Sequence, residues 1–291
     1  MYKEVAFDPE CLSELHYCGV LRSEFGYEKG RYIVANSKQW ATAAHKAVKN
    51  SESLRTKEKH AVKHLLSKIK MSRNHPLFIL PKYRTGVTSE TWLTWLEEQS
   101  KISRFDVIIS ERLDGALTFE QTVSGDSSWV IPPTIRVARS TDDIAAIISP
   151  LLKISSEIVI IDQYFSLSSN DVLYEMLSLA NKVRSIKKVT LVTAIQTKEP
   201  KKVFQQEYSS KFSYTPRFDF VVVADKFFHD RYILADVGGI KAGHGFSCAT
   251  TLGAQSDKVS LNICSQSEAE ETLAFLDEAL KNSKAHRTVL F

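Results

Sequence analysis

Apolar residues in the first part of the chain recur mostly at helical spacing. Across residues 51–70, the side chains of Val62, Leu65, Leu66 and Ile69 fall on one face of a predicted helix. Neighbouring segments show the same period, and extended alternation is rare. We therefore predict a mainly helical (α+β) N-terminal domain over residues 1–125.

Two tryptophans and two short segments complete this domain. Trp92 and Trp95 repeat on one stripe of a further predicted helix at residues 88–99. A stripe of this kind packs in a core more often than it faces a partner, so core packing is favoured. Residues 29–33, KGRYI, and 102–110, ISRFDVIIS, follow neither period and stay unassigned.

The pattern changes after residues 123–134, a run rich in Ser, Gly, Asp and Pro, where we place the domain boundary. Short continuous apolar segments, typical of buried strands, then alternate with segments of helical spacing. Residues 157–165 and 187–194 are predicted strands, and residues 170–183 are a predicted helix between them. We expect an α/β domain over residues 135–291, with a mixed sheet and helices on its faces.

Composition narrows the class of protein. A chain of 291 residues with 43% hydrophobic and 25% charged residues is long enough for two ordinary folded domains. The N-terminal residues lack the features of a signal peptide, and no apolar run approaches the length of a membrane span. The 4 cysteines include no CxxC pair, and Cys11, His16 and Cys18 lack a fourth ligand, so core packing is favoured. We expect a cytoplasmic protein without metal or cofactor.

The densest group of reactive side chains lies in residues 228–247, FHDRYILADVGGIKAGHGFS. On an extended strand, His229 and Arg231 project from the same face because the side-chain period is two. A guanidinium binds two phosphoryl oxygens at once, and a neutral imidazole can attack phosphorus or transfer a proton. Asp236 falls on the opposite face unless a turn or bulge redirects it. The segment therefore points to phosphate ester chemistry.

These residues resemble a known family. The spacing HxRx4D followed by Gly243 is similar to the HxKx4Dx6GS motif of the phospholipase D superfamily, with Arg231 in place of lysine and His244 in place of serine. The longer string HDRYILADVGGIKAGHGF resembles more closely the phospholipase-D-like domain at the C-terminus of MIT-domain proteins. Asp162 and Tyr164 match the Asp-x-Tyr element of that domain. The resemblance implies a phospholipase-D-like fold for the C-terminal domain and leaves the N-terminal one unexplained.

The resemblance also implies a mechanism. In catalytic members of the superfamily two motifs meet without metal, one histidine forming a phosphohistidine and the other protonating the leaving oxygen. This chain has one copy of the motif. The resemblance thus implies either a homodimer that pairs His229 of two chains or a domain that only binds phosphate. Single-motif domains of this type also resemble components of bacterial antiviral defence, which implies protein partners in a defence complex.

The favoured hypothesis is a metal-independent phosphodiesterase, specifically a nuclease that acts as a homodimer. His229 is then the nucleophile or acid, Arg231 the phosphate clamp, and Asp236 the residue that orients the imidazole. The expected substrate- or phosphate-binding positions are Asp162, Tyr164, Lys241, Gly243, His244 and Gly245.

Three alternatives stay open. The first is a non-catalytic module that binds nucleic acid or a phospholipid headgroup and recruits a partner. In the second, His229 and Arg231 form a structural cluster at a strand end, and the glycines only make turns. The third is a structural subunit that a partner recognises through Trp92 and Trp95.

Positive charge concentrates in residues 46–73, where nine lysines and arginines face two glutamates although the whole chain carries only +4. Such a helix can follow a nucleic-acid backbone or an anionic membrane, or can simply be a solvated face. The phosphate motif in the other domain favours nucleic acid. The candidate residues for nucleic-acid binding are Lys57, Lys63, Lys70 and Arg73.

Overall fold

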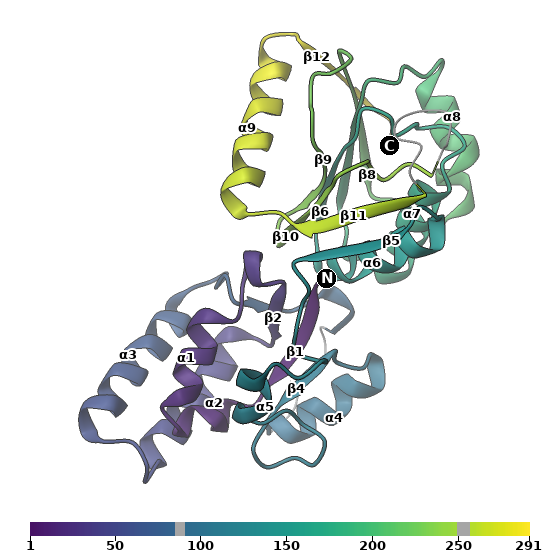
Figure 1. Cartoon of the computed structure of the whole chain (residues 1–291). Helices are drawn as coiled ribbons and strands as arrows, with labels where there is room; N and C mark the ends of the chain where they lie inside the picture. The colour runs from purple at the N-terminus through teal and green to yellow at the C-terminus, as the bar shows by residue number, and fades with distance from the viewer. Residues whose placement is uncertain (85–90, 249–256) are drawn as a thin grey trace. The chain divides into compact units, whose positions relative to one another are not determined.

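A computed structural model describes residues 1–84, 91–248 and 257–291 (Figure 1). The chain divides into two compact units, Tyr2–Ile131 and Pro132–Phe291, with Met1 grouped with the second. Among the described residues, no helix has both the length and the apolar content needed to cross a membrane.

The N-terminal unit is built around a parallel sheet of four strands in the order β3-β2-β1-β4. Its strands are β1 (Lys3–Phe7), β2 (Arg31–Val34), β3 (Phe78–Ile79) and β4 (Val107–Ile109). Its α-helices are α1 (His16–Ser23), α2 (Ser37–Asn50), α3 (Thr56–Met71), α4 (Trp92–Ile102) and α5 (Phe119–Ser124). Helices make up most of the regular structure of the unit, as predicted, but the parallel sheet makes it α/β and not α+β.

Strand length explains this error. The strands β2, β3 and β4 have only 4, 2 and 3 residues, too few to display a period in the sequence. The unassigned segment 29–33 contains all of β2 but its last residue, and segment 102–110 contains β4. The parallel pairing buries all four residues of β2, so its side chains do not alternate between polar and apolar.

A buried ion pair crosses the N-terminal unit. Arg84 is 1% exposed and forms two hydrogen bonds of 3.0 Å to the carboxylate of Glu4 in β1. Its Nη1 donates to the carbonyl oxygens of Gln99 and Ser103 at the end of α4. Because each charge is hydrogen-bonded, the pair is tolerated inside the unit. Removing either partner alone would leave the other as an unpaired charge in the interior of the unit.

The C-terminal unit contains a mixed sheet of eight strands in the order β12-β8-β7-β6-β9-β10-β11-β5. The strands are β5 (Thr134–Ala138), β6 (Glu157–Ile161), β7 (Lys188–Thr193), β8 (Arg217–Val223), β9 (Arg231–Ala235), β10 (Gly238–Ala242), β11 (Lys258–Ile263) and β12 (Ala285–Val289). The helices are α6 (Thr141–Ile154), α7 (Asp171–Val183), α8 (Pro200–Glu207) and α9 (Gln266–Lys281). The prediction of an α/β unit with a mixed sheet is confirmed.

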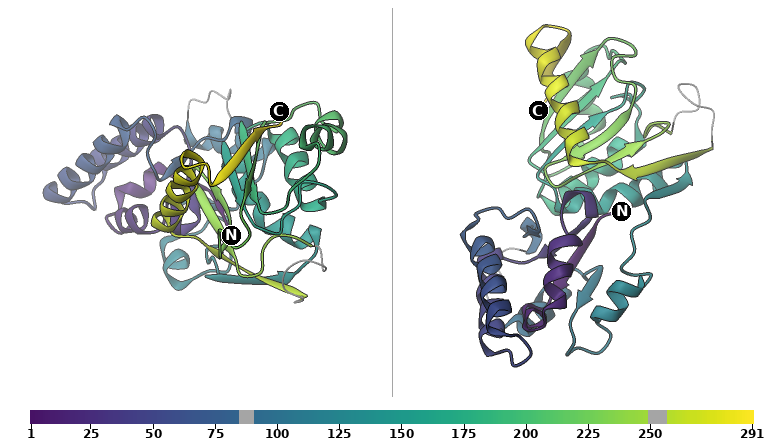
Figure 2. Two further views of the ribbon diagram at one scale, coloured as in Figure 1. Left: turned by 90° about the horizontal axis from the view of Figure 1, so that it is seen from above. Right: turned by 60° about the vertical axis from the view of Figure 1, so that its left-hand side comes forward.

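The strand directions bring the phosphate motif to one edge of this sheet. β6, β7 and β8 are parallel, whereas β9 pairs antiparallel with both β6 and β10. Consequently the end of β6, the start of β9 and the end of β10 meet at the same edge. Helix α9 lies on one face of the sheet and helices α6 and α7 on the other (Figure 2).

The variant Glu4→Gln should lower the free energy of unfolding of the N-terminal unit by about 3 kcal/mol, since it leaves a buried guanidinium without its counter-charge. Urea denaturation followed by tryptophan fluorescence measures this, because Trp40, Trp92, Trp95 and Trp129 all belong to this unit. The control is Glu10→Gln, in an exposed pair with Arg112, which should change stability by less than about 1 kcal/mol. Equal effects of the two variants would contradict the assigned role of Arg84.

Candidate phosphate site at the β6–β9–β10 edge

The register of the central strands sets the geometry of the site. Ile161 in β6 pairs with Tyr232 in β9, which places the next residue of the β6 segment, Asp162, opposite Arg231. Arg231 pairs in turn with Ala242, the last residue of β10. The sheet therefore brings together residues that are about seventy positions apart in the chain.

Asp162 ties three segments together. Its side chain is buried, with the residue 1% exposed, and its Oδ1 accepts a hydrogen bond from the Tyr164 amide at 3.0 Å. Its Oδ2 accepts one from the Phe246 amide at 2.8 Å. Burial raises the pKa of the carboxyl group, and the two amide bonds and the nearby charges of Arg231 and Arg139 act in the opposite direction. Asp162 thus anchors the loop after β10 to the end of β6.

Of the two glycines in the anchored loop, Gly243 and Gly245, only Gly245 occupies a position that requires glycine. Gly245 has a φ of +84°, and a Cβ added there would lie 2.5 Å from Oδ2 of Asp162. Around Gly243 the nearest atom to such a Cβ is the Ser260 carbonyl oxygen at 4.0 Å. Gly245 is therefore fixed by close approach to a buried carboxylate, whereas Gly243 is not.

Arg231 is held beside Asp162. Its Nη1 donates to the carbonyl oxygen of His229 at 2.9 Å, and its guanidinium carbon lies 5.8 Å from the centre of the Tyr164 ring. Its buried Nε has no hydrogen-bond partner among the described residues. Because Nε is enclosed, an oxyanion from solvent would meet the outer nitrogens of this half-buried guanidinium.

His229 and His244 lie at the surface of the same edge. His229 is exposed and lies two residues before the first residue of β9. His244 is exposed between the two glycines of the loop. The site therefore combines Asp162, Tyr164 and Arg231 with two solvent-accessible imidazoles.

Lys241 does not join these residues. It pairs across the sheet with Tyr232, on the face opposite to Arg231, and forms ion pairs with Asp230 at 2.9 Å and Glu268 at 2.8 Å. The Glu268 and Asp230 carboxylates raise the pKa of Lys241, and Lys241 lowers the pKa of both carboxyl groups. Two carboxylates already neutralise the ammonium group of Lys241. Lys241 was expected to bind phosphate, but it does not offer an unpaired positive charge to the site.

Asp236 lies at the far end of β9 from His229. Its carboxylate accepts hydrogen bonds from the Ser156 amide and hydroxyl at 2.9 and 2.7 Å and from the Glu157 amide at 3.3 Å, at the start of β6. The intervening strand of five residues spans roughly 16 Å at 3.3 Å per residue. The pairing of β9 with β6 is continuous from Tyr232 to Ala235, so no bulge shortens this path. Asp236 is thus a strand-pinning residue and does not orient the imidazole of His229.

Arg139 is a further charged residue that the sequence did not point to. Its Nε donates to the Ser247 carbonyl oxygen at 2.7 Å, and its charge acts on the Asp162 carboxyl group. A single arginine between a domain boundary and a predicted helix belongs to no sequence pattern that indicates a functional residue. It adds a second positive charge beside the buried carboxylate.

The nucleic-acid candidates of the N-terminal unit lie along and just beyond α3. Lys57, Lys70 and Arg73 are exposed, whereas Lys63 is half-buried. Helix α3 buries Val62, Leu66 and Ile69, the apolar face expected from their spacing. The exposed basic side chains are therefore free of the packing of this helix.

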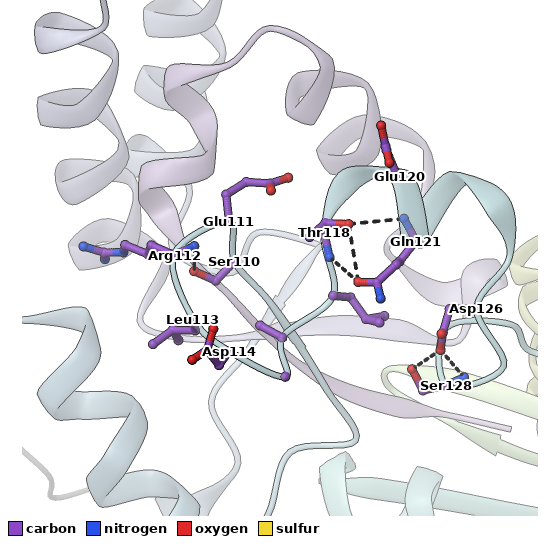
Figure 3. A pocket seen from close by; sticks show the side chains of 13 residues that line it. Ser110, Glu111, Arg112, Leu113, Asp114, Thr118, Glu120, Gln121, Asp126 and Ser128 are labelled. Carbon is purple, nitrogen blue, oxygen red and sulfur yellow. Dashed lines mark hydrogen bonds between the residues drawn. The ribbon is translucent and has the colours of Figure 1, made fainter.

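A cavity of about 810 Å³ in the N-terminal unit was not foreseen from the sequence (Figure 3). It lies beside the end of β4 and includes Ser110, Glu111 and Arg112 in its wall. Asp8, which follows β1, accepts hydrogen bonds from Ser110 at 2.8 Å and from Arg112 at 2.7 and 3.1 Å. No group of three or more His, Cys, Asp or Glu residues suited to a metal occurs in the described part of the chain.

The variant Gly245→Ala should destabilise the C-terminal unit by about 2 kcal/mol through strain at a positive φ and the contact with Asp162. Hydrogen exchange should show faster exchange of the Phe246 amide, whose bond to Asp162 is displaced. The matched control is Gly243→Ala, for which the space is open and no such change is expected. Continued protection of the Phe246 amide in Gly245→Ala would refute this account of the loop.

No known family model matches the chain, and no curated protein matches it either. Among solved structures, TrmBL2, described as an archaeal chromatin protein with a novel mode of DNA binding, is similar at 12% sequence identity and a TM-score of 0.32. This match covers 55% of the present chain and 55% of the TrmBL2 chain. Similarity at this level shows neither a shared fold nor a shared ligand.

Proposed function

We propose that the C-terminal unit binds a phosphodiester group of a nucleic acid at the β6–β9–β10 edge, in a phospholipase-D-like arrangement. The observation that carries this proposal is the position of Arg231, fixed beside the buried Asp162 with an unpartnered Nε. His229, His244 and the backbone of the glycine loop flank the same position. They supply further donors to phosphate oxygens.

The local charge supports an anionic ligand. Two guanidinium groups, those of Arg231 and Arg139, act on the carboxylate of Asp162, so positive charge is present at this position. The exposed basic side chains of α3, in the other unit, are by themselves suited to a polyanion, which favours nucleic acid over an isolated phosphate group.

The variant Arg231→Met should weaken binding of a labelled oligonucleotide by about tenfold or more, since a charge-assisted hydrogen bond contributes about 1.5–3 kcal/mol. Fluorescence anisotropy with DNA and RNA of equal length, in EDTA and at fixed salt, gives the dissociation constants. Lys241→Met is the control, because Lys241 is paired with Asp230 and Glu268, and it should change the dissociation constant less than about threefold.

Two outcomes would contradict the proposal. Equal losses for the two variants would show that only net charge matters. Preferential, Arg231-dependent binding to phosphatidylglycerol vesicles over oligonucleotides would instead identify a phospholipid headgroup as the ligand.

Hydrolysis of the phosphodiester by a homodimer is a second candidate function. It is favoured by the exposure of His229 next to the clamp residue Arg231, whose Nη1 bonds to the His229 carbonyl. An imidazole nitrogen of His229 would attack phosphorus, forming a P–N bond while the P–O bond to the leaving oxygen breaks. His229 of a second chain would give its proton to that oxygen, and water would then cleave the P–N bond.

The variant His229→Ala should abolish cleavage of the oligonucleotide in EDTA while weakening binding much less than Arg231→Met does, because the guanidinium of Arg231 is kept. Light scattering on the same samples should show a dimer for the wild-type protein. Cleavage that persists in His229→Ala would eliminate this mechanism. A monomer that binds but never cleaves would leave the binding function alone.

A further inference from the structure

An aromatic cluster lies on the α9 face of the C-terminal sheet. It consists of Phe227 and Phe228, in the loop before β9, and Phe275, on α9. The Phe227 and Phe275 rings are stacked, with centroids 4.9 Å apart. Phe228 meets the two rings edge-on, at 5.1 and 5.6 Å, and is only 8% exposed. Phe275 is 47% exposed, so its two neighbours hold in place a phenyl ring that stays open to solvent.

This aromatic cluster forms the apolar wall of a cavity of about 280 Å³. The volume lies below the roughly 300–1,000 Å³ that is typical of small-molecule sites, so the cavity suits a single side chain better than a cofactor. The rest of its wall includes His229, Asp230 and Tyr232 around the start of β9, and Glu271 on α9. The cavity thus combines aromatic rings with carboxylates.

The cavity lies on the side of the sheet away from the phosphate site. Tyr232 follows Arg231 directly in β9, and successive side chains of a strand point to opposite faces of the sheet. The hydroxyl of Tyr232 donates to Glu268 of α9 at 2.8 Å, which identifies its face as the one that α9 covers. The cavity is therefore separate from Arg231, and its own wall determines what it can bind.

The two carboxylates of the cavity wall differ in their partners. Asp230 forms an ion pair of 2.9 Å with Lys241, which also pairs with Glu268 at 2.8 Å. Glu271 is exposed and forms no ion pair with any described residue. Helix α9 adds little positive charge of its own, since its charged residues are Glu268, Glu270, Glu271, Asp277, Glu278 and Lys281. The cavity thus offers an uncompensated negative charge beside an exposed ring.

An exposed ring next to an unpaired carboxylate favours a cationic side chain as the ligand. The face of an aromatic ring attracts a cation, and Glu271 supplies the counter-charge. A purely apolar group would desolvate the carboxylate without pairing it, and an anion would be repelled by it. Arginine fits better than lysine, because its guanidinium is planar, weakly hydrated and able to bind a carboxylate through two N–H groups.

We propose that this cavity binds an arginine side chain of a protein partner, with the guanidinium packed against the Phe275 ring and paired with the Glu271 carboxylate. Phe227 and Phe228 keep the ring in place, and the aliphatic stem of the arginine covers apolar surface that solvent otherwise contacts. This recognition of a partner does not depend on the phosphate-binding function, because the two sites lie on opposite faces of the sheet.

The experiment measures the binding of three short peptides to the full chain by NMR chemical-shift titration. Each peptide consists of glycine and serine around one central residue, which is arginine, lysine or citrulline. Citrulline has the shape of arginine without its charge. The protein variants are Phe275→Leu, Phe275→Tyr and Glu271→Gln. The matched control is Asp277→Asn, because Asp277 is an exposed carboxylate of the same helix that does not line the cavity.

We expect the arginine peptide to shift the amide signals of residues 271–275 saturably, the lysine peptide to bind several-fold more weakly and the citrulline peptide not to bind. Phe275→Leu and Glu271→Gln should each weaken binding of the arginine peptide about fivefold, since one removes the π-face and the other the counter-charge. Phe275→Tyr and Asp277→Asn should bind as the wild-type protein does. Unchanged signals outside the cavity show that each variant is folded.

The inference is overturned if the arginine peptide gives no saturable shift up to about 10 mM, or if the citrulline peptide binds equally well. Equal losses in Asp277→Asn and Glu271→Gln would also overturn it, because only the overall acidity of α9 would then matter. Light scattering provides a further test: a wild-type dimer that Phe275→Leu dissociates would identify the aromatic cluster as a contact between two copies of this chain. Failure of oligonucleotides to bind through Arg231 would remove the phosphate-binding function and leave this inference unaffected.

Discussion

The arrangement of the C-terminal unit at the β6–β9–β10 edge depends on the buried carboxylate of Asp162. A carboxylate removed from water costs several kcal/mol unless hydrogen bonds and positive charge compensate it. Here the amides of Tyr164 and Phe246 supply the hydrogen bonds, and the second of these requires the loop after β10 to close onto β6. That closure in turn leaves no space for a side chain at Gly245. One desolvated charge thus determines the conformation of the loop and places the guanidinium of Arg231.

Strand alternation then divides the charged residues around the start of β9 into two groups. Arg231 lies on the face of the sheet that carries Asp162, whereas Asp230 and Tyr232 lie on the α9 face and meet Lys241 and Glu268. Lys241 consequently links α9 to the sheet on the face opposite Arg231.

The sequence allowed prediction of elements that are long and have a clear hydrophobic pattern. It did not allow prediction of contacts that depend on the register between strands. The buried strands β6 and β7 and the helix α7 between them are visible as apolar runs and helical spacing, so the α/β class of the C-terminal unit could be predicted. The parallel sheet of the N-terminal unit could not, because its shortest strand, β3, has 2 residues. Within the site, the period of two links His229 to Arg231, but only the pairing of β9 with β6 shows that Asp236 binds Ser156 instead. Arg139 has no sequence signal, since its role arises entirely from folding.

Both units place an aspartate directly after a parallel strand, and the two aspartates differ in how they use the neighbouring arginine. Asp8 and Asp162 are each 1% exposed. Asp8 uses both oxygens on the guanidinium of Arg112, at 2.7 and 3.1 Å, so this cation is neutralised within the unit. Asp162 uses its oxygens on backbone amides, and Arg231 bonds to a carbonyl oxygen. Among the contacts of the described residues, Arg231 forms no ion pair with Asp162, so its charge is not neutralised as that of Arg112 is and can serve an oxyanion from solution in the proposed function.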